Sequence, residues 1–355
     1  MDVGPARGPL LQTRARASRV ETTGRRRRGS PSAIGRTPLV EIGLRIDGRW
    51  RGVGLKLESY NPGGSIKDRT AYALLRSLEA MNGLHPGDRL VESTSGNLGV
   101  ALAMISRERG YGFTAVVDPK VDPLVVDRMR SFGAEVVLVD QPDHTGGFLL
   151  SRLHVVRQMA SDEGMIWPNQ YANPANPAIH YHQTGPEIRR QQPGVDAVFL
   201  ATSTGGTLAG IGRYFKAVKP GVKVVGVDVP GSRVFGDVQA PRLLNGVGSS
   251  CASQFLRPSD YDDVVIVSDR DAIAACHLVH ESVDIGLGGS SGAVVAACAR
   301  YLADNPDVHQ PVCICADGRP NYLNSIYSEA WLARFAFRPP ADMAALAFDD
   351  ARLVP

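Results

Sequence analysis

From about residue 52 onward, the arrangement of hydrophobic and polar residues switches repeatedly between a pattern typical of strands and one typical of helices. Short apolar runs rich in Val, Ile and Phe, bounded by Gly, Pro, Asn or Asp, predict strands. Longer helix-like stretches separate them. The expected strands are 53–57, 89–92, 113–117, 135–139, 197–201, 223–228, 264–267 and 312–315. The expected helices are 66–81, 97–107, 123–132, 147–160, 177–190, 207–218, 270–283 and 291–302.

The alternation of strand and helix predicts an α/β fold with parallel sheets covered on both faces. Ligands of such sheets bind outside the carboxyl ends of the strands, where the loops gather. The chain shows no internal repeat at a fixed period. The strand-to-helix loops are therefore the first places to look for chemistry.

Composition agrees with an ordinary globular protein. Of the 355 residues, 43% are hydrophobic and 21% are charged, which excludes a largely disordered, collagenous or fibrous chain. We find no apolar run long enough for a membrane-spanning helix and no signal-peptide core, and five cysteines in a chain of this length do not form a disulfide framework. We therefore expect a cytoplasmic, reduced protein.

The net charge of +3 hides an uneven distribution. Residues 1–30 carry a net charge of +6, and the remainder carries −3. The first 30 residues are rich in Arg, Gly, Pro, Ser and Thr, and they predict a disordered extension. The alternative is an arm that binds nucleic acid or another polyanion, but basic and aromatic residues do not interleave in the rest of the chain.

The loop NPGGSIKDR at 61–69 carries one of only six lysines. Ser65 can cap a helix whose first turn holds Lys67, and the helix dipole lowers the pKa of an amine at that end. A lysine with a lowered pKa suits Schiff-base chemistry. An exposed surface lysine is the alternative, and a phosphate loop of the Walker type is excluded because the Gly-Lys-Ser/Thr order is missing.

Three further loops offer small and hydroxyl residues at helix starts. The loop STSGNLG at 93–99 can cradle a carboxylate, and STGGT at 203–207 can cradle a phosphate, because free backbone N–H groups converge there. The loop GGSSGA at 288–293 adds further hydroxyls. Each loop alone could be an ordinary helix cap or a glycine-rich turn. The glycines at 205, 210 and 212 have the wrong spacing for a dinucleotide fingerprint.

Taken together, these loops resemble the cysteine synthase and cystathionine β-synthase family of fold-type II pyridoxal-phosphate enzymes. The resemblance runs from GRTPL at 35–39 to about residue 323. It includes the lysine loop at 61–69, the loop at 93–99, and the segments QYANPANPAIH at 170–180 and TGPE at 184–187. Four signatures in the family's order make this a specific match.

The resemblance implies a role for each loop. Lys67 would bind pyridoxal 5'-phosphate covalently and then move protons at the substrate α-carbon. Asn97 would contact the cofactor's ring oxygen, and Ser290 would face its pyridine nitrogen. The residues implied to bind the cofactor phosphate are Ser203, Thr204, Gly205, Gly206 and Thr207. Those implied to bind the substrate carboxylate are Thr94, Ser95, Gly96, Asn97 and Gln170.

A neutral serine beside the pyridine nitrogen favours β-replacement. Unlike an aspartate, its hydroxyl does not keep that nitrogen protonated, so a long-lived carbanion is less favoured. Prompt loss of a β-substituent then gives an enzyme-bound aminoacrylate, to which a nucleophile adds. We expect a transferase without a metal ion.

Several departures from the common cysteine synthase pattern point to one branch of the family. They are Glu92-Ser93 before Thr94, Ser203 at the start of the phosphate loop, NGVGSS at 245–250 and the segment 322–331. They resemble the branch that joins O-phospho-L-serine and L-glutamate to give N-(2-amino-2-carboxyethyl)-L-glutamate, a precursor of 2,3-diaminopropionate in siderophores and antibiotics. Arg152 is our candidate contact for a phosphate or carboxylate, although it could be a surface arginine.

Three alternatives remain open. The first is a cysteine synthase that uses O-acetylserine or O-phosphoserine and sulfide. The second is cystathionine β-synthase, which is disfavoured because no regulatory domain follows residue 331 and no Cys/His pair near the N-terminus suggests a haem site. The third is a catalytically silent binding or regulatory homologue, although Lys67 and Asn97 are both present.

The family architecture implies two domains and a homodimer. We expect a smaller mobile domain at 45–168 and a larger cofactor-binding domain formed by 31–44 and 169–330, with a tail at 331–355. The cofactor would lie between the domains, and their closure would exclude water. The expected partners are small amino-acid substrates rather than nucleic acid or a membrane.

Overall fold

The computed structural model describes residues 31–46, 49–81, 83–94, 96–144, 146–236, 238–337 and 353–354. The expected extension at 1–30 and most of the expected tail at 331–355 lie outside these residues. Within them the chain forms two mainly parallel sheets flanked by helices, so the expected α/β fold is confirmed. No helix in the described residues is long and apolar enough to cross a membrane.

The larger sheet has the strand order β1-β2-β9-β6-β7-β8-β10. Its central strands are parallel, whereas β1 pairs antiparallel with β2 and β10 pairs antiparallel with β8. The strands of this sheet are β1 (Leu39–Ile46), β2 (Arg49–Leu57), β6 (Ala197–Ala201), β7 (Lys223–Asp228), β8 (Asp263–Ile266), β9 (Pro311–Cys315) and β10 (Leu353–Val354).

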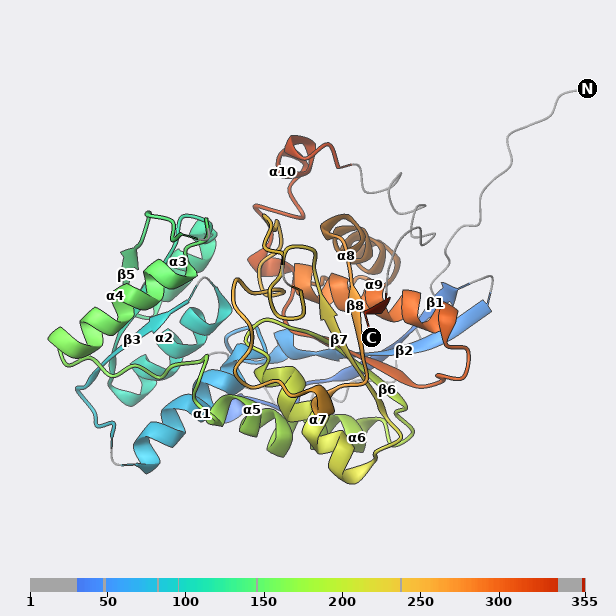
Figure 1. Cartoon of the computed structure of the whole chain (residues 1–355), viewed down its shortest axis with the longest axis horizontal. Coiled ribbons are helices and arrows are strands. Elements are labelled where there is room, and N and C mark those ends of the chain that lie inside the picture. The colour runs from blue at the N-terminus through green and yellow to red at the C-terminus, as the bar shows by residue number, and fades with distance from the viewer. Residues whose placement is uncertain are drawn as a thin grey trace, which may run out of the picture.

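The smaller sheet has the parallel order β3-β4-β5 and lies to the left of the larger one in Figure 1. Its strands are β3 (Arg89–Ser93), β4 (Gly112–Val117) and β5 (Glu135–Leu138). The buried apolar side chains around this sheet form clusters separate from those around the larger sheet. The two sheets therefore have their own hydrophobic cores.

The helices follow the expected order, and most of their ends agree with the sequence to within two residues. They are α1 (Lys67–Ala80), α2 (Asn97–Arg109), α3 (Pro123–Ser131), α4 (Leu149–Asp162), α5 (Ala175–Ile179), α6 (Gly185–Gln191), α7 (Gly206–Val218), α8 (Asp269–Val283), α9 (Gly289–Asp304) and α10 (Glu329–Arg334). The single expected helix at 177–190 is α5, one π-helical turn at His180–Thr184, and α6.

The structure adds elements that the sequence pattern did not predict. Strand β1 is antiparallel to β2, and helix α10 lies beyond the last expected helix (Figure 1). Strand β2 lies inside the segment 45–168, yet it pairs with β9 in the larger sheet. The hairpin partner β1 keeps it there, so we propose that the smaller domain begins after Leu57.

Candidate active site

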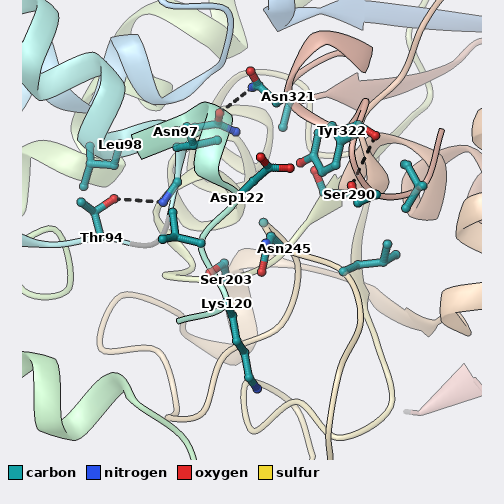
Figure 2. Close-up of a pocket in the computed structure, with 18 of the residues that line it drawn as sticks. Thr94, Asn97, Leu98, Lys120, Asp122, Ser203, Asn245, Ser290, Asn321 and Tyr322 are labelled. Carbon is teal, nitrogen blue, oxygen red and sulfur yellow. Dashed lines mark hydrogen bonds between the residues drawn. The ribbon is translucent and has the colours of Figure 1, made fainter. Parts of the chain in front are cut away.

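Seven of the predicted site residues line one cavity of about 470 Å³ that receives residues from the sides of both sheets. Figure 2 shows part of its wall, with Asn97 and Thr94 from the smaller sheet's side and Ser203, Asn245 and Ser290 from the larger one's. The sequence-predicted residues that line it are Lys67, Thr94, Gly96, Asn97, Gln170, Ser203 and Ser290. Residues more than 200 positions apart in the chain therefore share one site.

Lys67 is the first residue of α1 and projects into this cavity. Its backbone N–H donates to the Ser65 Oγ at 3.2 Å, so Ser65 satisfies one of the free donors of the helix start, as expected. Burial lowers the pKa of the Lys67 amine, and the nearby carboxylate of Asp317 opposes this shift. Burial thus favours the neutral, nucleophilic form of the amine, and the carboxylate of Asp317 favours its protonated form.

The loop after β3 presents Asn97 at the start of α2. Thr94 Oγ1 accepts the backbone N–H of Gly99 at 3.0 Å and so caps the helix. The Asn97 carboxamide donates through Nδ2 to Asp317 Oδ2 at 2.6 Å and accepts from Asn321 Nδ2 at 2.8 Å. Gly96 lines the cavity beside Asn97. The predicted contact Ser95 lies outside the described residues.

The loop 203–207 connects β6 to α7. Gly205 has a φ of +85°, a left-handed conformation that favours glycine, and Gly206 begins the helix. A small pocket next to Lys67 is lined by Ser203, Thr204, Gly205 and Thr207. The Thr207 hydroxyl lies 3.3 Å from the imidazole Nε2 of buried His180. Hydroxyls, backbone N–H groups and the N-terminus of a 13-residue helix thus surround an anion-sized space.

Ser290 and Gln170 complete the predicted set. Ser290 lies in the first turn of α9, is only 1% exposed, and contributes to the cavity wall (Figure 2). Gln170 is also buried, and its Nε2 donates to the backbone carbonyl of Ser93 at 2.9 Å. That bond ties the segment to the end of β3, and Asn176 Nδ2 donates to the Gln170 carbonyl at 2.8 Å within the segment.

Arg152 is buried, not a surface residue. It lies on α4 with 6% of its surface exposed, and its Nε is 3.3 Å from Asp118 Oδ2. Its Nε and Nη1 have no hydrogen-bond partner within the described part of the chain. Together with Lys120 and Arg242 it lines a second cavity of about 330 Å³.

The second cavity adjoins the first and is cationic. The two share the wall residues Lys120, Tyr171, Ser203, Leu244, Asn245 and Gly246. Among the described residues, three cationic side chains line the second cavity, and one acidic side chain, that of Asp118, opposes them. The arrangement can bind an anion next to whatever occupies the first cavity.

The sequence analysis missed three residues of the site that follow β9. Asn321 and Tyr322 line the first cavity, and Asp317 lies behind its wall with 2% of its surface exposed. Their distance in sequence from every glycine-rich loop explains the omission. The only signal was their place after the end of a central parallel strand, where ligand-binding residues gather.

Comparisons with known proteins show which family the chain resembles. A family model described as pyridoxal-phosphate dependent enzyme matches residues 31–317. The chain is 44% identical over 306 residues to N-(2-amino-2-carboxyethyl)-L-glutamate synthase of Ralstonia nicotianae, covering 85% of this chain and 90% of the relative. It is 41% identical over 330 residues to the synthase of the same name from Cupriavidus metallidurans, covering 91% and 96%.

A solved structure shares the fold. The crystal structure of O-ureido-L-serine synthase matches with a TM-score of 0.77 and 31% sequence identity, covering 85% of this chain and 98% of that chain. Both of its sheets and the connecting loops therefore have counterparts in a solved enzyme.

Proposed function

The chain belongs to the cysteine synthase family of pyridoxal-phosphate-dependent β-replacement enzymes, and we propose that it joins O-phospho-L-serine and L-glutamate to give N-(2-amino-2-carboxyethyl)-L-glutamate. The observation that carries the proposal is the identity of 44% and 41% to two synthases named for that product, over nearly the whole chain. The product would serve as a precursor of 2,3-diaminopropionate for a siderophore or peptide antibiotic.

The residues of the first cavity fit pyridoxal phosphate. Lys67 offers an amine whose pKa is lowered by burial, which favours the neutral form needed for covalent attachment. The small pocket beside it offers the hydroxyls and helix N-terminus of the 203–207 loop for a phosphate. Ser290 offers a neutral hydroxyl from the opposite wall. We propose that Lys67 binds the cofactor covalently, that the 203–207 loop binds its phosphate and that Ser290 contacts its ring.

Bound pyridoxal phosphate supplies an electron sink that lets the substrate α-carbon lose its proton and the β-substituent leave. In our proposal the Lys67 amine accepts and returns the α-proton, because a neutral amine is the base that this step needs. Thr94, Gln170 and the loop around Gly96 orient the substrate carboxylate. The hydroxyl of Ser290 would lie beside the ring nitrogen and would not keep it protonated, which would favour prompt departure of the β-substituent.

The second cavity supports an anionic pair of substrates. O-phospho-L-serine brings a phosphate and L-glutamate brings a side-chain carboxylate, and each needs a cation that acetylserine and sulfide do not need. The buried guanidinium of Arg152 lines this cavity, its Nε forms an ion pair with Asp118, and its Nη1 has no hydrogen-bond partner among the described residues. We propose that Arg152 binds the anionic group of one of these substrates, with Lys120 and Arg242 lining the same cavity.

A competition experiment tests the proposed reaction. Purified enzyme loaded with pyridoxal phosphate is given O-phospho-L-serine with equal concentrations of L-glutamate and sulfide, and the products are identified by mass spectrometry. The glutamate adduct supports the proposal. Cysteine as the main product would instead assign the chain to cysteine synthesis, and no product at all would favour a silent homologue. The Lys67→Ala variant serves as the inactive control.

Two structural expectations belong to the same proposal. We propose that residues 58–168 close over the bound substrate and that the protein forms a homodimer, as the family architecture implies. Light scattering of the purified protein measures whether it is a dimer. Small-angle scattering with and without O-phospho-L-serine measures domain closure, because closure reduces the radius of gyration.

A further inference from the structure

Asp317 connects the loops that carry the proposed cofactor-binding residues. It follows β9 by two positions, and its backbone forms an isolated antiparallel bridge with Ser65, two residues before Lys67. Its carbonyl accepts from the Ser291 hydroxyl at 3.1 Å, next to Ser290. The Asp317 side chain is buried, with 2% of its surface exposed. A charged carboxylate in such a place costs free energy unless hydrogen bonds or an opposite charge offset that cost.

The side chain of Asp317 fixes the orientation of Asn97. Its Oδ2 accepts from Asn97 Nδ2 at 2.6 Å and from the Tyr322 hydroxyl at 2.6 Å. Because an ionised carboxylate only accepts hydrogen bonds, the atom of Asn97 beside it must be the amide nitrogen. At the other end, Asn321 donates to the Asn97 carbonyl. The carboxamide is thus held at both ends, and Figure 2 shows the hydrogen bond to Asn321.

This arrangement leaves one amide hydrogen of Asn97 without an acceptor in the described part of the chain. A carboxamide has two N–H donors, and Asp317 takes one of them. The carbonyl oxygen already accepts from Asn321. The group that Asn97 can present to a ligand in the cavity is therefore a donor, which matches an electron-rich oxygen and not a protonated hydroxyl.

Burial raises the pKa of the Asp317 carboxyl, whereas the hydrogen bonds from Tyr322 and Asn97 and the charge of Lys67 oppose this shift and favour the ionised form. Oδ1 is buried and accepts no hydrogen bond from the described residues. The titratable groups around the carboxyl are Lys67, Tyr322, Cys276 and Cys315. Burial raises the pKa of Tyr322 and of both thiols far above neutrality, so these three stay uncharged. Lys67 is the cation among these groups whose charge acts on the carboxyl.

We propose that Asp317 is a positioning residue of the active site, which turns the free amide hydrogen of Asn97 toward the ring oxygen of pyridoxal phosphate and whose negative charge favours the protonated state of the Lys67 nitrogen. The proposal rests on the roles of Asn97 and Lys67 in the proposed function. Asp317 lies outside the family's loop signatures. In this proposal it sets both the orientation of Asn97 and the charge near Lys67.

Two substitutions separate the geometry from the charge. Asp317→Asn has the same shape and retains one oxygen acceptor for Asn97, but it removes the charge. Asp317→Ala removes both. Asp284→Asn makes the same chemical change at a side chain that is 98% exposed, so it serves as the matched control. All are prepared as full-length protein and loaded with pyridoxal phosphate, without any substrate.

The readouts are the dissociation constant of pyridoxal phosphate and the pH titration of the bound cofactor's absorbance. We expect Asp317→Asn to bind the cofactor but to shift the titration midpoint to lower pH by about one unit, because the neighbouring charge is lost. We expect Asp317→Ala to show the same shift and, in addition, about tenfold weaker cofactor binding, because Asn97 is released. The control should match the wild-type protein in both.

An unchanged midpoint in Asp317→Asn together with unchanged affinity in Asp317→Ala would overturn the proposal. If neither variant folds, Asn321→Ala tests the geometry alone, since it releases the other end of the Asn97 amide. It should weaken cofactor binding about tenfold and leave the midpoint in place; unchanged binding would contradict the assignment. These measurements use no substrate. If the competition experiment gave no glutamate adduct, that result would contradict the proposed reaction but not the role of Asp317.

Discussion

The Oε2 atom of Glu92 accepts the backbone N–H of Gln170 at 3.0 Å, so the end of β3 is tied directly to a residue of the cavity wall. The other oxygen of Glu92 accepts from the Trp167 indole at 3.0 Å and from the backbone N–H of Ser93 at 2.9 Å. A fully buried carboxyl group thus replaces water as the partner of several N–H donors.

Replacing this carboxylate should loosen the Gln170 segment. In Glu92→Gln, one half of the side chain becomes an NH₂ group that faces N–H donors, so at least one donor loses its acceptor. We expect a loss of about 1–3 kcal/mol in the free energy of unfolding and a higher KM for O-phospho-L-serine. Chemical denaturation and steady-state kinetics measure these, with Glu108→Gln on the exposed face of α2 as the control.

The same residue predicts a pH dependence of stability. Burial raises the pKa of Glu92 from its usual 4.5 to about 7. Between these values the folded protein binds more protons at this site than the unfolded chain, so the contribution of Glu92 to the free energy of unfolding falls as pH rises. The total fall is up to about 3 kcal/mol. The difference in stability between wild type and Glu92→Gln, measured from pH 4.5 to 8, should show this fall; a constant difference would contradict it.

Lys67→Ala should abolish covalent attachment of the cofactor. Reductive trapping with borohydride followed by mass spectrometry should add the mass of the reduced cofactor to the peptide of wild-type protein that contains Lys67, and not to that of the variant. We expect turnover to fall by about a thousandfold or more, because one amine both attaches the cofactor and moves the proton. Lys223→Ala, at the exposed start of β7, should retain both properties.

Gly205→Ala should damage the phosphate pocket. A Cβ there would lie 2.1 Å from the Ser253 Oγ, and the φ of +85° strains any residue with a side chain. We expect cofactor affinity to fall at least tenfold and the unfolding free energy to fall by about 1–3 kcal/mol. Equilibrium binding and thermal melts measure these. Gly221→Ala is the control, since its Cβ would meet nothing within 4 Å.

Arg152→Ala should raise the KM for an anionic substrate. Removal of the guanidinium takes a cation from the second cavity and leaves Asp118 without its ion pair. We expect a rise of about tenfold or more for O-phospho-L-serine or L-glutamate, with a smaller change in kcat. Arg152→Lys should recover part of the loss, and Arg130→Ala on the exposed side of α3 should have no effect. Equal KM values in all four proteins would contradict the assignment.

Much of the site could be predicted from the sequence because its signals are local. Lys67 follows a serine that accepts its backbone N–H, and Gly205 takes a conformation that favours glycine. Both effects depend on residues a few positions apart. The alternation of strand and helix then places such loops at the carboxyl ends of parallel strands, where they meet.

The sequence by itself thus determined the α/β fold, the family, the cofactor and the loops that meet in the first cavity. Only the tertiary structure decided which residues from distant parts of the chain contact these loops. It placed Asp317 and Asn321 on either end of the Asn97 carboxamide, across 220 and 224 positions of sequence, and it turned Arg152 inward onto Asp118. The reason is physical: helix caps and turns are set by neighbours in sequence, whereas the partner of a buried charge is chosen by packing between distant segments.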